Sequence, residues 1–351
     1  MKTAKPNIKL LFYGFCLATV LYNCKTKDVD SLTPFTYTFK GFTDVKLPDV
    51  KPTAPAAVSV TAASVTSSTA AAAVSAGLSS LSATGVVPAA VQQAASDVGK
   101  AITPAAASQL SASFTPDVIK TMSTTGEIPA NLKSQLTALS NNPALKAYLP
   151  TFTLPTVNGK AVGGRVGATS GSNIVATVAT ANAALDDDAC KAAANAAYNT
   201  ALAGLQATQA SQTAAINANF TQIQTGISAE SAPCKAGLTA KYTPLRAVAQ
   251  QAFDAGMASL DANKAILGGA YDLLRLLYLA ALADANDVFT KLQAAETTAC
   301  DAVGAAKLAN AQAARDKDLN TINSNFNAAA GSLKATLTKA TASCHNQGNG
   351  G

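Results

Sequence analysis

Tryptophan is missing from this chain of 351 residues, and histidine occurs only once, as His345. His345 lies in a glycine-rich stretch at 345–351, which we expect to be a disordered tail. A His-based catalytic triad, a His-rich metal site and an imidazole proton shuttle therefore cannot be built from the residues that we expect to be structured.

Two common ligand motifs are also missing from the sequence. Its cysteines include no Cys-x-x-Cys pair, the usual element of a zinc site. Its glycines gather between Gly159 and Gly171 without the Lys-Ser or Lys-Thr that ends a phosphate-binding loop. No sequence signal singles out a serine–lysine or carboxylate-pair enzyme. We therefore predict no catalytic residue, no metal and no cofactor, and a protein that is not an enzyme.

Charge is sparse, since Asp, Glu, Lys and Arg make up 13% of the residues, with 26 basic against 20 acidic side chains. Lys2, Lys5 and Lys9 lie in a segment that we expect to be removed, and without them the positive excess falls by half. The remaining charges are scattered, which argues against a nucleic-acid partner. The abundant alanines bury little area each, so we expect a thin core that disulfides support.

The N-terminal segment 1–23 has the pattern of an export signal. Three lysines precede a 12-residue apolar run at 10–21, which is too short to span a bilayer. The residues that follow, Leu21-Tyr22-Asn23-Cys24, resemble the lipobox of bacterial lipoprotein signal peptides. This resemblance implies cleavage before Cys24 and attachment of diacylglycerol to its sulfur, so that the membrane is a partner through the lipid. An uncleaved anchor and an ordinary secretory signal are the alternatives.

The six cysteines fit export to an oxidising compartment. Cys16 would leave with the signal and Cys24 would carry the lipid. Any other assignment leaves an odd free thiol. We predict a mature protein in the bacterial cell envelope, anchored by lipid on the periplasmic or surface side, in which two disulfides join the remaining residues Cys190, Cys234, Cys300 and Cys344.

Equal spacing suggests how these four cysteines pair. Cys190 and Cys234 lie 44 residues apart, and so do Cys300 and Cys344. A helix of that length rises about 66 Å, so its two ends cannot meet within the roughly 4.4–6.8 Å that a disulfide requires. Two parallel helices would place Cys190 beside Cys300 and Cys234 beside Cys344. We predict this pairing over Cys190–Cys234 with Cys300–Cys344, which needs a hairpin within each span.

The pairing predicts the fold of residues 185–344, an all-α, elongated antiparallel three-helix bundle that is Ala-rich and coiled-coil-like. The expected helices run over 190–230, 245–298 and 300–343, and Pro233 and Pro244 bracket the first turn. Apolar residues step by 3 and 4 along the first helix, as in a coiled-coil seam. We expect Gly268-Gly269 to kink or break the middle helix.

The middle helix is apolar on nearly every side over 273–282. A helix of this kind is expected to be buried on every side. Asp272 and Arg275 argue against a membrane span. The alternative to burial is a patch for self-association or for an envelope protein, formed by Leu273, Leu276, Leu277 and Leu279.

Composition divides the chain before the bundle. Residues 24–84 are expected to be a flexible tether and low-complexity spacer, with the spacer at 64–73. They contain the aromatic arm Phe35, Tyr37 and Phe39, which fits a short strand or side chains that dock on the bundle. We expect short helices over 85–157, with an extended segment at 152–157. A Gly-rich linker over 158–184 is expected to begin with a turn at Asn158-Gly159.

Two functions from different classes fit these features. The first is a lipid-anchored envelope or cell-surface lipoprotein with a structural or spacer role and no catalysis. The alternative is a binding module that recognises an envelope protein or a cell-wall polymer through the apolar middle helix or the aromatic arm. An exposed apolar patch at either place would favour the binding module.

Overall fold

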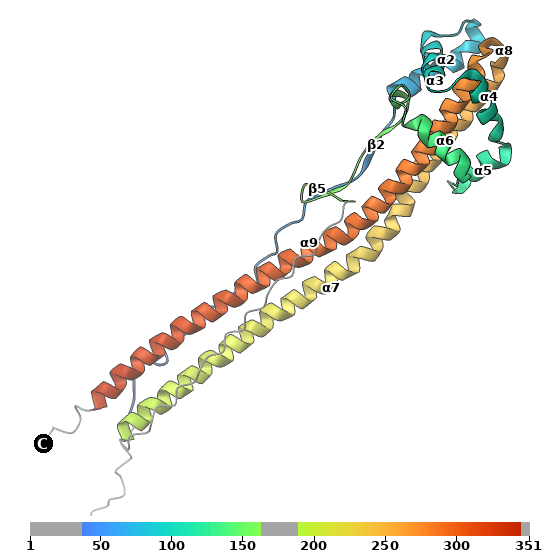
Figure 1. Ribbon diagram of the computed structural model, residues 1–351. Coiled ribbons are helices and arrows are strands. Elements are labelled where there is room, and N and C mark those ends of the chain that lie inside the picture. The colour runs from blue at the N-terminus through green and yellow to red at the C-terminus, as the bar shows by residue number, and fades with distance from the viewer. Residues whose placement is uncertain (1–36, 126, 163–188, 345–351) are drawn as a thin grey trace, which may run out of the picture. The chain divides into compact units, whose positions relative to one another are not determined.

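The computed structural model describes residues 37–125, 127–162 and 189–344, and it is mostly helical (Figure 1). This confirms the helical class that the sequence predicts. The predicted signal segment 1–23, the lipid site Cys24, Phe35 and the tail 345–351 lie outside the described residues. So does the stretch 163–184 of the predicted linker.

Two helices of 74 residues each dominate the described part: α7 at Ala189–Ala262 and α9 at Ala270–Ser343. The three-helix bundle is not confirmed, because α7 continues through Pro233 and Pro244, where a turn was expected. A proline inside a helix removes one backbone hydrogen bond and costs about 3 kcal/mol. Contacts between α7 and α9 offset that cost here, since Leu238 and Tyr242 between the two prolines are buried.

The chain reverses direction between α7 and α9 at residues 263–269. Helix α8, Lys264–Leu267, fills most of this turn, and Gly268 ends it at φ 52° and ψ −126°. Side chains are strained at such a positive φ, which explains the glycine. The predicted break at Gly268-Gly269 is therefore confirmed, and it is the turn of a helical hairpin.

The disulfides are Cys190–Cys344 and Cys234–Cys300, with Cα–Cα distances of 5.8 and 6.0 Å. The predicted pairing of Cys190 with Cys300 and of Cys234 with Cys344 is wrong. Equal spacing suits an antiparallel pair as well as a parallel one, because residues at equal distances from a hairpin turn lie opposite each other. Leu267 in the turn lies midway in sequence between the partners of both disulfides.

The described residues divide into two compact units. Unit 1 comprises residues 37–49, 189–212 and 322–344, and unit 2 comprises residues 50–125, 127–162 and 213–321. Each unit contains one disulfide, Cys190–Cys344 in unit 1 and Cys234–Cys300 in unit 2.

The core of unit 1 lies between α7, α9 and the N-terminal arm. Phe42 and Leu47 of the arm are buried against Leu205, Leu333 and small residues of the two helices. Phe39 packs on the same core and meets the Phe42 ring edge-on, with ring centroids 6.5 Å apart. No strand forms at residues 37–39. Phe39 docks on the core instead, as the second sequence interpretation predicts.

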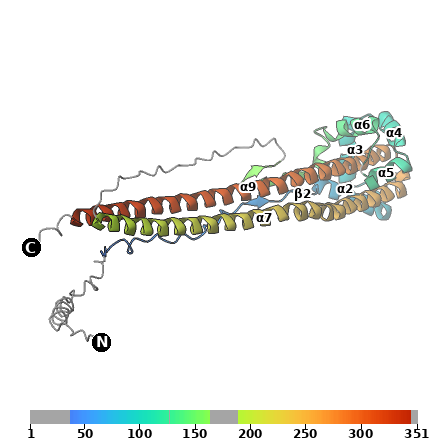
Figure 2. The ribbon, with the colours of Figure 1, turned by 90° about the horizontal axis from the view of Figure 1, so that it is seen from below.

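Unit 2 contains five short helices, which gather around α8 and the adjoining ends of α7 and α9 (Figures 1 and 2). They are α2 at Thr69–Thr84, α3 at Ala89–Ala101, α4 at Pro104–Ser113, α5 at Pro116–Thr125 and α6 at Ala130–Ser140, followed by a 3-10 turn at Lys146–Tyr148. Ser68 caps α2 by accepting a hydrogen bond from the Ala71 N–H. The short helices after residue 85 confirm the prediction, whereas the expected spacer at 64–73 is partly strand and partly helix.

A narrow antiparallel ribbon completes unit 2. Strand β1, Val60–Thr61, pairs with β4 at Thr156–Val157. Strand β2, Ser64–Thr66, pairs with β3 at Thr151–Thr153. Strand β5, Lys160–Ala161, pairs with β4 through a tight turn at Asn158 and Gly159, whose φ values are 51° and 75°. The extended segment and the Asn-Gly turn are thus where the sequence predicts them.

Candidate functional site

The apolar segment of α9 is a core element. Leu273, Leu276, Leu277 and Leu279 are buried, and they pack with apolar side chains of α2–α6 and α7. Side chains of the five short helices, together with Phe253 and Leu260 of α7, provide this cover. Burial on every side is therefore confirmed, and none of the four leucines forms an exposed patch.

Arg275 lies within this core and binds the end of a neighbouring helix. Its guanidinium donates to the Ser111 carbonyl at 3.0 Å, the Ser111 hydroxyl at 2.8 Å and the Phe114 carbonyl at 3.2 Å. These carbonyls belong to the C-terminus of α4, where the helix dipole favours a cation. The Arg275 guanidinium therefore stabilises a contact within unit 2 of the same chain.

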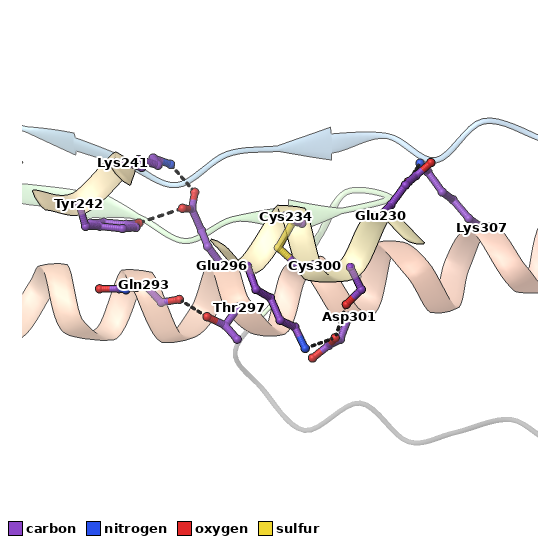
Figure 3. The surroundings of a disulfide bond; sticks show 12 residues. Glu230, Cys234, Lys241, Tyr242, Gln293, Glu296, Thr297, Cys300, Asp301 and Lys307 are labelled. Atoms are coloured by element: carbon purple, nitrogen blue, oxygen red, sulfur yellow. Dashed lines mark hydrogen bonds and ion pairs between the residues drawn. A yellow bond between two sulfur atoms is a disulfide. The ribbon is translucent and has the colours of Figure 1, made fainter. Parts of the chain in front are cut away.

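A cluster of titratable side chains surrounds the buried Glu296 on α9 (Figure 3). One carboxylate oxygen accepts from Lys241 Nζ at 2.5 Å and from the Ala63 N–H at 2.9 Å. The other accepts from the Tyr242 hydroxyl at 3.1 Å. Glu296 thus joins α7 and α9 to the chain just before β2.

Electrostatics keep Tyr242 protonated as a hydrogen-bond donor. Burial raises the pKa of the phenol, and the negative charge of Glu296 raises it further, with Arg246 acting in the opposite direction. Tyr242 therefore cannot act as a base near neutral pH, and both oxygens of Glu296 already have donors. This arrangement is suited to holding three segments together.

Charged pairs surround the adjacent Cys234–Cys300 disulfide (Figure 3). Lys235 lies 2.6 Å from Asp301, and Lys307 pairs with Glu230. The hydrogen bond from Lys235 lowers the pKa of the Asp301 carboxyl. These pairs are exposed to solvent, where ion pairs add little to the stability of the fold. The disulfide is therefore the main link between α7 and α9 in this region.

A second buried carboxylate, Asp318 on α9, binds Thr53. It accepts from the Thr53 N–H at 2.7 Å and from the Thr53 hydroxyl at 2.5 Å. A small pocket lies beside Asp318 and Phe220. The Arg315 guanidinium covers the Phe220 ring at 4.6 Å from its centroid.

Sequence reasoning missed both buried carboxylates, although a signal for them exists. Glu296 follows Leu292 by four residues, and Asp318 precedes Ile322 by four, so both lie on the apolar stripe of α9. An acidic residue on such a stripe predicts a buried partner.

In the described ranges, no three His, Cys, Asp or Glu side chains are grouped as a metal site would require. None of the helices in those ranges combines the length and the apolar character needed to cross a membrane.

Comparison of the chain with protein-family models, curated proteins and solved structures gives no match in any of the three. The function is therefore argued from the residues and contacts of the chain itself.

Proposed function

We propose that this protein is a lipoprotein of the bacterial cell envelope, held by lipid on Cys24, with a structural role and no catalytic one. The observation that carries the proposal is the pair of disulfides, Cys190–Cys344 and Cys234–Cys300. Disulfides persist in exported proteins and are rare in reducing compartments. With these four cysteines paired and Cys16 in the signal, Cys24 is the thiol left for the lipid.

The contacts of α7 and α9 support a structural role. Both helices are rich in alanine, which buries little area per residue. Covalent links at two levels of the hairpin offset this weakness, each typically by about 2–4 kcal/mol. Glu296, Asp318 and Arg275 all bind other segments of the same chain.

The alternative, a binding module, has less support from the described residues. The leucines that would form its patch are buried in unit 2, and Phe39 packs on the core of unit 1. Of the aromatic arm, only Phe35 falls outside the described residues.

Mass spectrometry of the mature protein tests the proposal. The full chain is produced in a bacterium with its N-terminal segment intact, and the N-terminal peptide is analysed in the wild type and in Cys24→Ala. We expect the wild-type peptide to begin at Cys24, to carry diacylglycerol and to fractionate with membranes. Cys24→Ala should lack the lipid and leave the membrane fraction. An unmodified Cys24, or equal membrane binding by the variant, would overturn the lipid anchor.

A further inference from the structure

The two disulfides differ in how far solvent reaches them. In Cys190–Cys344 both residues are buried, with 4% and 8% of their surface exposed. In Cys234–Cys300 only Cys300 is buried, whereas Cys234 is exposed. A thiol can therefore approach the second disulfide from the solvent side of Cys234, while the first disulfide has no exposed residue. Exposed disulfides exchange with thiols more readily than buried ones.

The part of α7 that carries Cys234 is thinly packed. No side chain of α7 is buried between Ile216 and Leu238, a stretch of about six turns. Pro233 and two glycines lie within this stretch, and these residue types weaken a helix. The helix is nevertheless continuous there, so contacts with other segments must hold it.

The polar contacts beside Cys234 are weak compared with the disulfide. Glu230 pairs with Lys307, and Lys235 pairs with Asp301, both at the surface. Solvent screens such pairs, so they add little stability. The covalent bond to α9 is therefore the strongest link of this stretch of α7.

The neighbouring parts of α7 have links of their own. After the stretch, Leu238 and Tyr242 pack in one apolar cluster with Leu292 of α9, and the Tyr242 hydroxyl donates to Glu296. Before the stretch, Ile216 is buried. Loss of the Cys234–Cys300 bond is therefore expected to act on the helix between Ile216 and Leu238 and to spare the packed parts on either side.

We propose that Cys234–Cys300 is a site of thiol–disulfide exchange whose reaction partner is a protein dithiol, and that Cys190–Cys344 is the permanent structural link. One thiolate of the partner attacks Cys234 Sγ and forms a mixed disulfide. The bond to Cys300 Sγ breaks, and its electron pair leaves on that sulfur, which takes up a proton. The second thiol of the partner then attacks the mixed disulfide, which releases the reduced Cys234 and leaves the partner oxidised to a disulfide.

The exchange changes α7 locally. Once the bond is reduced, residues 217–237 keep neither a covalent link to α9 nor a buried side chain of their own. Helical segments with few buried contacts open at a small fraction of the global unfolding free energy. The redox state of Cys234 and Cys300 therefore sets the local stability of this part of the hairpin. This inference does not depend on how the N-terminus is anchored.

Graded reduction of the folded, full-length protein tests the difference between the disulfides. The protein is treated with increasing concentrations of dithiothreitol without denaturant, free thiols are alkylated, and the modified cysteines are identified by mass spectrometry. We expect alkylation of Cys234 and Cys300 to be faster than that of Cys190 and Cys344 by roughly tenfold or more. Equal rates, or the opposite order, would overturn the proposal.

A thioredoxin-type protein whose second active-site cysteine is replaced by serine tests the point of attack. Such a probe forms the mixed disulfide but cannot resolve it. We expect the trapped probe to be linked to Cys234. A link to Cys300 would show that the assigned point of attack is wrong, and the absence of any trapped complex would contradict a protein dithiol as the partner.

Hydrogen exchange tests the consequence for α7. In the double variant Cys234→Ser with Cys300→Ser, amides of residues 217–237 should exchange roughly tenfold faster than in the wild type, while amides of α9 at 301–318 keep their protection. The matched control, Cys190→Ser with Cys344→Ser, should leave exchange at 217–237 unchanged. Unchanged exchange in the first variant, or equal acceleration in both, would show that the Cys234–Cys300 bond does not hold this stretch.

Discussion

At the residue scale, one glycine shows how closely the two long helices approach. Gly256 on α7 faces the ring of Tyr278 on α9, and a Cβ at this glycine would lie 2.0 Å from a ring carbon. The ring is also held at its hydroxyl, which is 2.9 Å from Ser75 Oγ on α2. The tyrosine therefore needs a residue without a side chain opposite it.

Replacing Gly256 by alanine is expected to lower the free energy of unfolding by about 1–3 kcal/mol, because the ring must leave its place in a packed core. The matched control is Gly226→Ala on the same helix, where a Cβ meets nothing within 4 Å. That control should stabilise the protein by up to about 1 kcal/mol, since alanine favours a helix over glycine. Thermal unfolding of both variants measures the two changes in stability. Equal changes for Gly256→Ala and Gly226→Ala would contradict the packing argument.

A second residue-scale prediction concerns Asp284 on α9. Burial raises the pKa of this carboxyl, and Asp287 raises it further, with Lys291 partly opposing them. The folded state therefore binds a proton more readily than the unfolded chain, so ionisation of Asp284 costs stability above the raised pKa. Asp284→Asn should raise the unfolding free energy at neutral pH, and the gain should shrink as the pH falls through the folded-state pKa. Denaturant unfolding across pH 4–8 measures this, and a gain independent of pH would contradict the assignment.

At the scale of elements, Arg275 connects α9 to the C-terminus of α4. Arg275→Met keeps the apolar part of the side chain but removes three hydrogen bonds and leaves the buried Ser111 without its donor. We expect a loss of about 1–3 kcal/mol in the free energy of unfolding. Relative to the wild type, the substitution should accelerate hydrogen exchange more in α4 than in α2, because α2 has no contact with this guanidinium in the described structure. Arg275→Lys is the control and should lose less, and an unchanged α4 in Arg275→Met would contradict the account.

The same scale shows what the sequence could predict and what it could not. The apolar run at 273–282 predicted the buried leucines correctly, and the short helices expected over 85–157 form as α3 to α6, because these signals are local. Pro233 and Pro244 were misleading, since tertiary contacts of Leu238 and Tyr242 outweigh a local backbone cost. The contacts of Glu296 and Asp318 depend on Ala63 and Thr53, which lie more than 200 residues away in sequence, and no local pattern encodes that pairing.

At the scale of the whole molecule, the positions of the four paired cysteines are symmetric about the turn between α7 and α9. Both disulfides are centred in sequence on Leu267, and the helices that they join are equal in length. A hairpin that turns at Gly268 therefore explains the equal spacing, the helix break and the two links together. The parallel arrangement explained only the spacing.

The central claim is that the chain is a helical hairpin with two disulfides in one antiparallel register. Peptide mapping of the non-reduced protein, purified from the envelope of the producing bacterium, tests it most directly. We predict two linked peptide pairs, Cys190 with Cys344 and Cys234 with Cys300. Cys190 linked to Cys300 or to Cys234, or four free thiols, would contradict the hairpin or its export to an oxidising compartment.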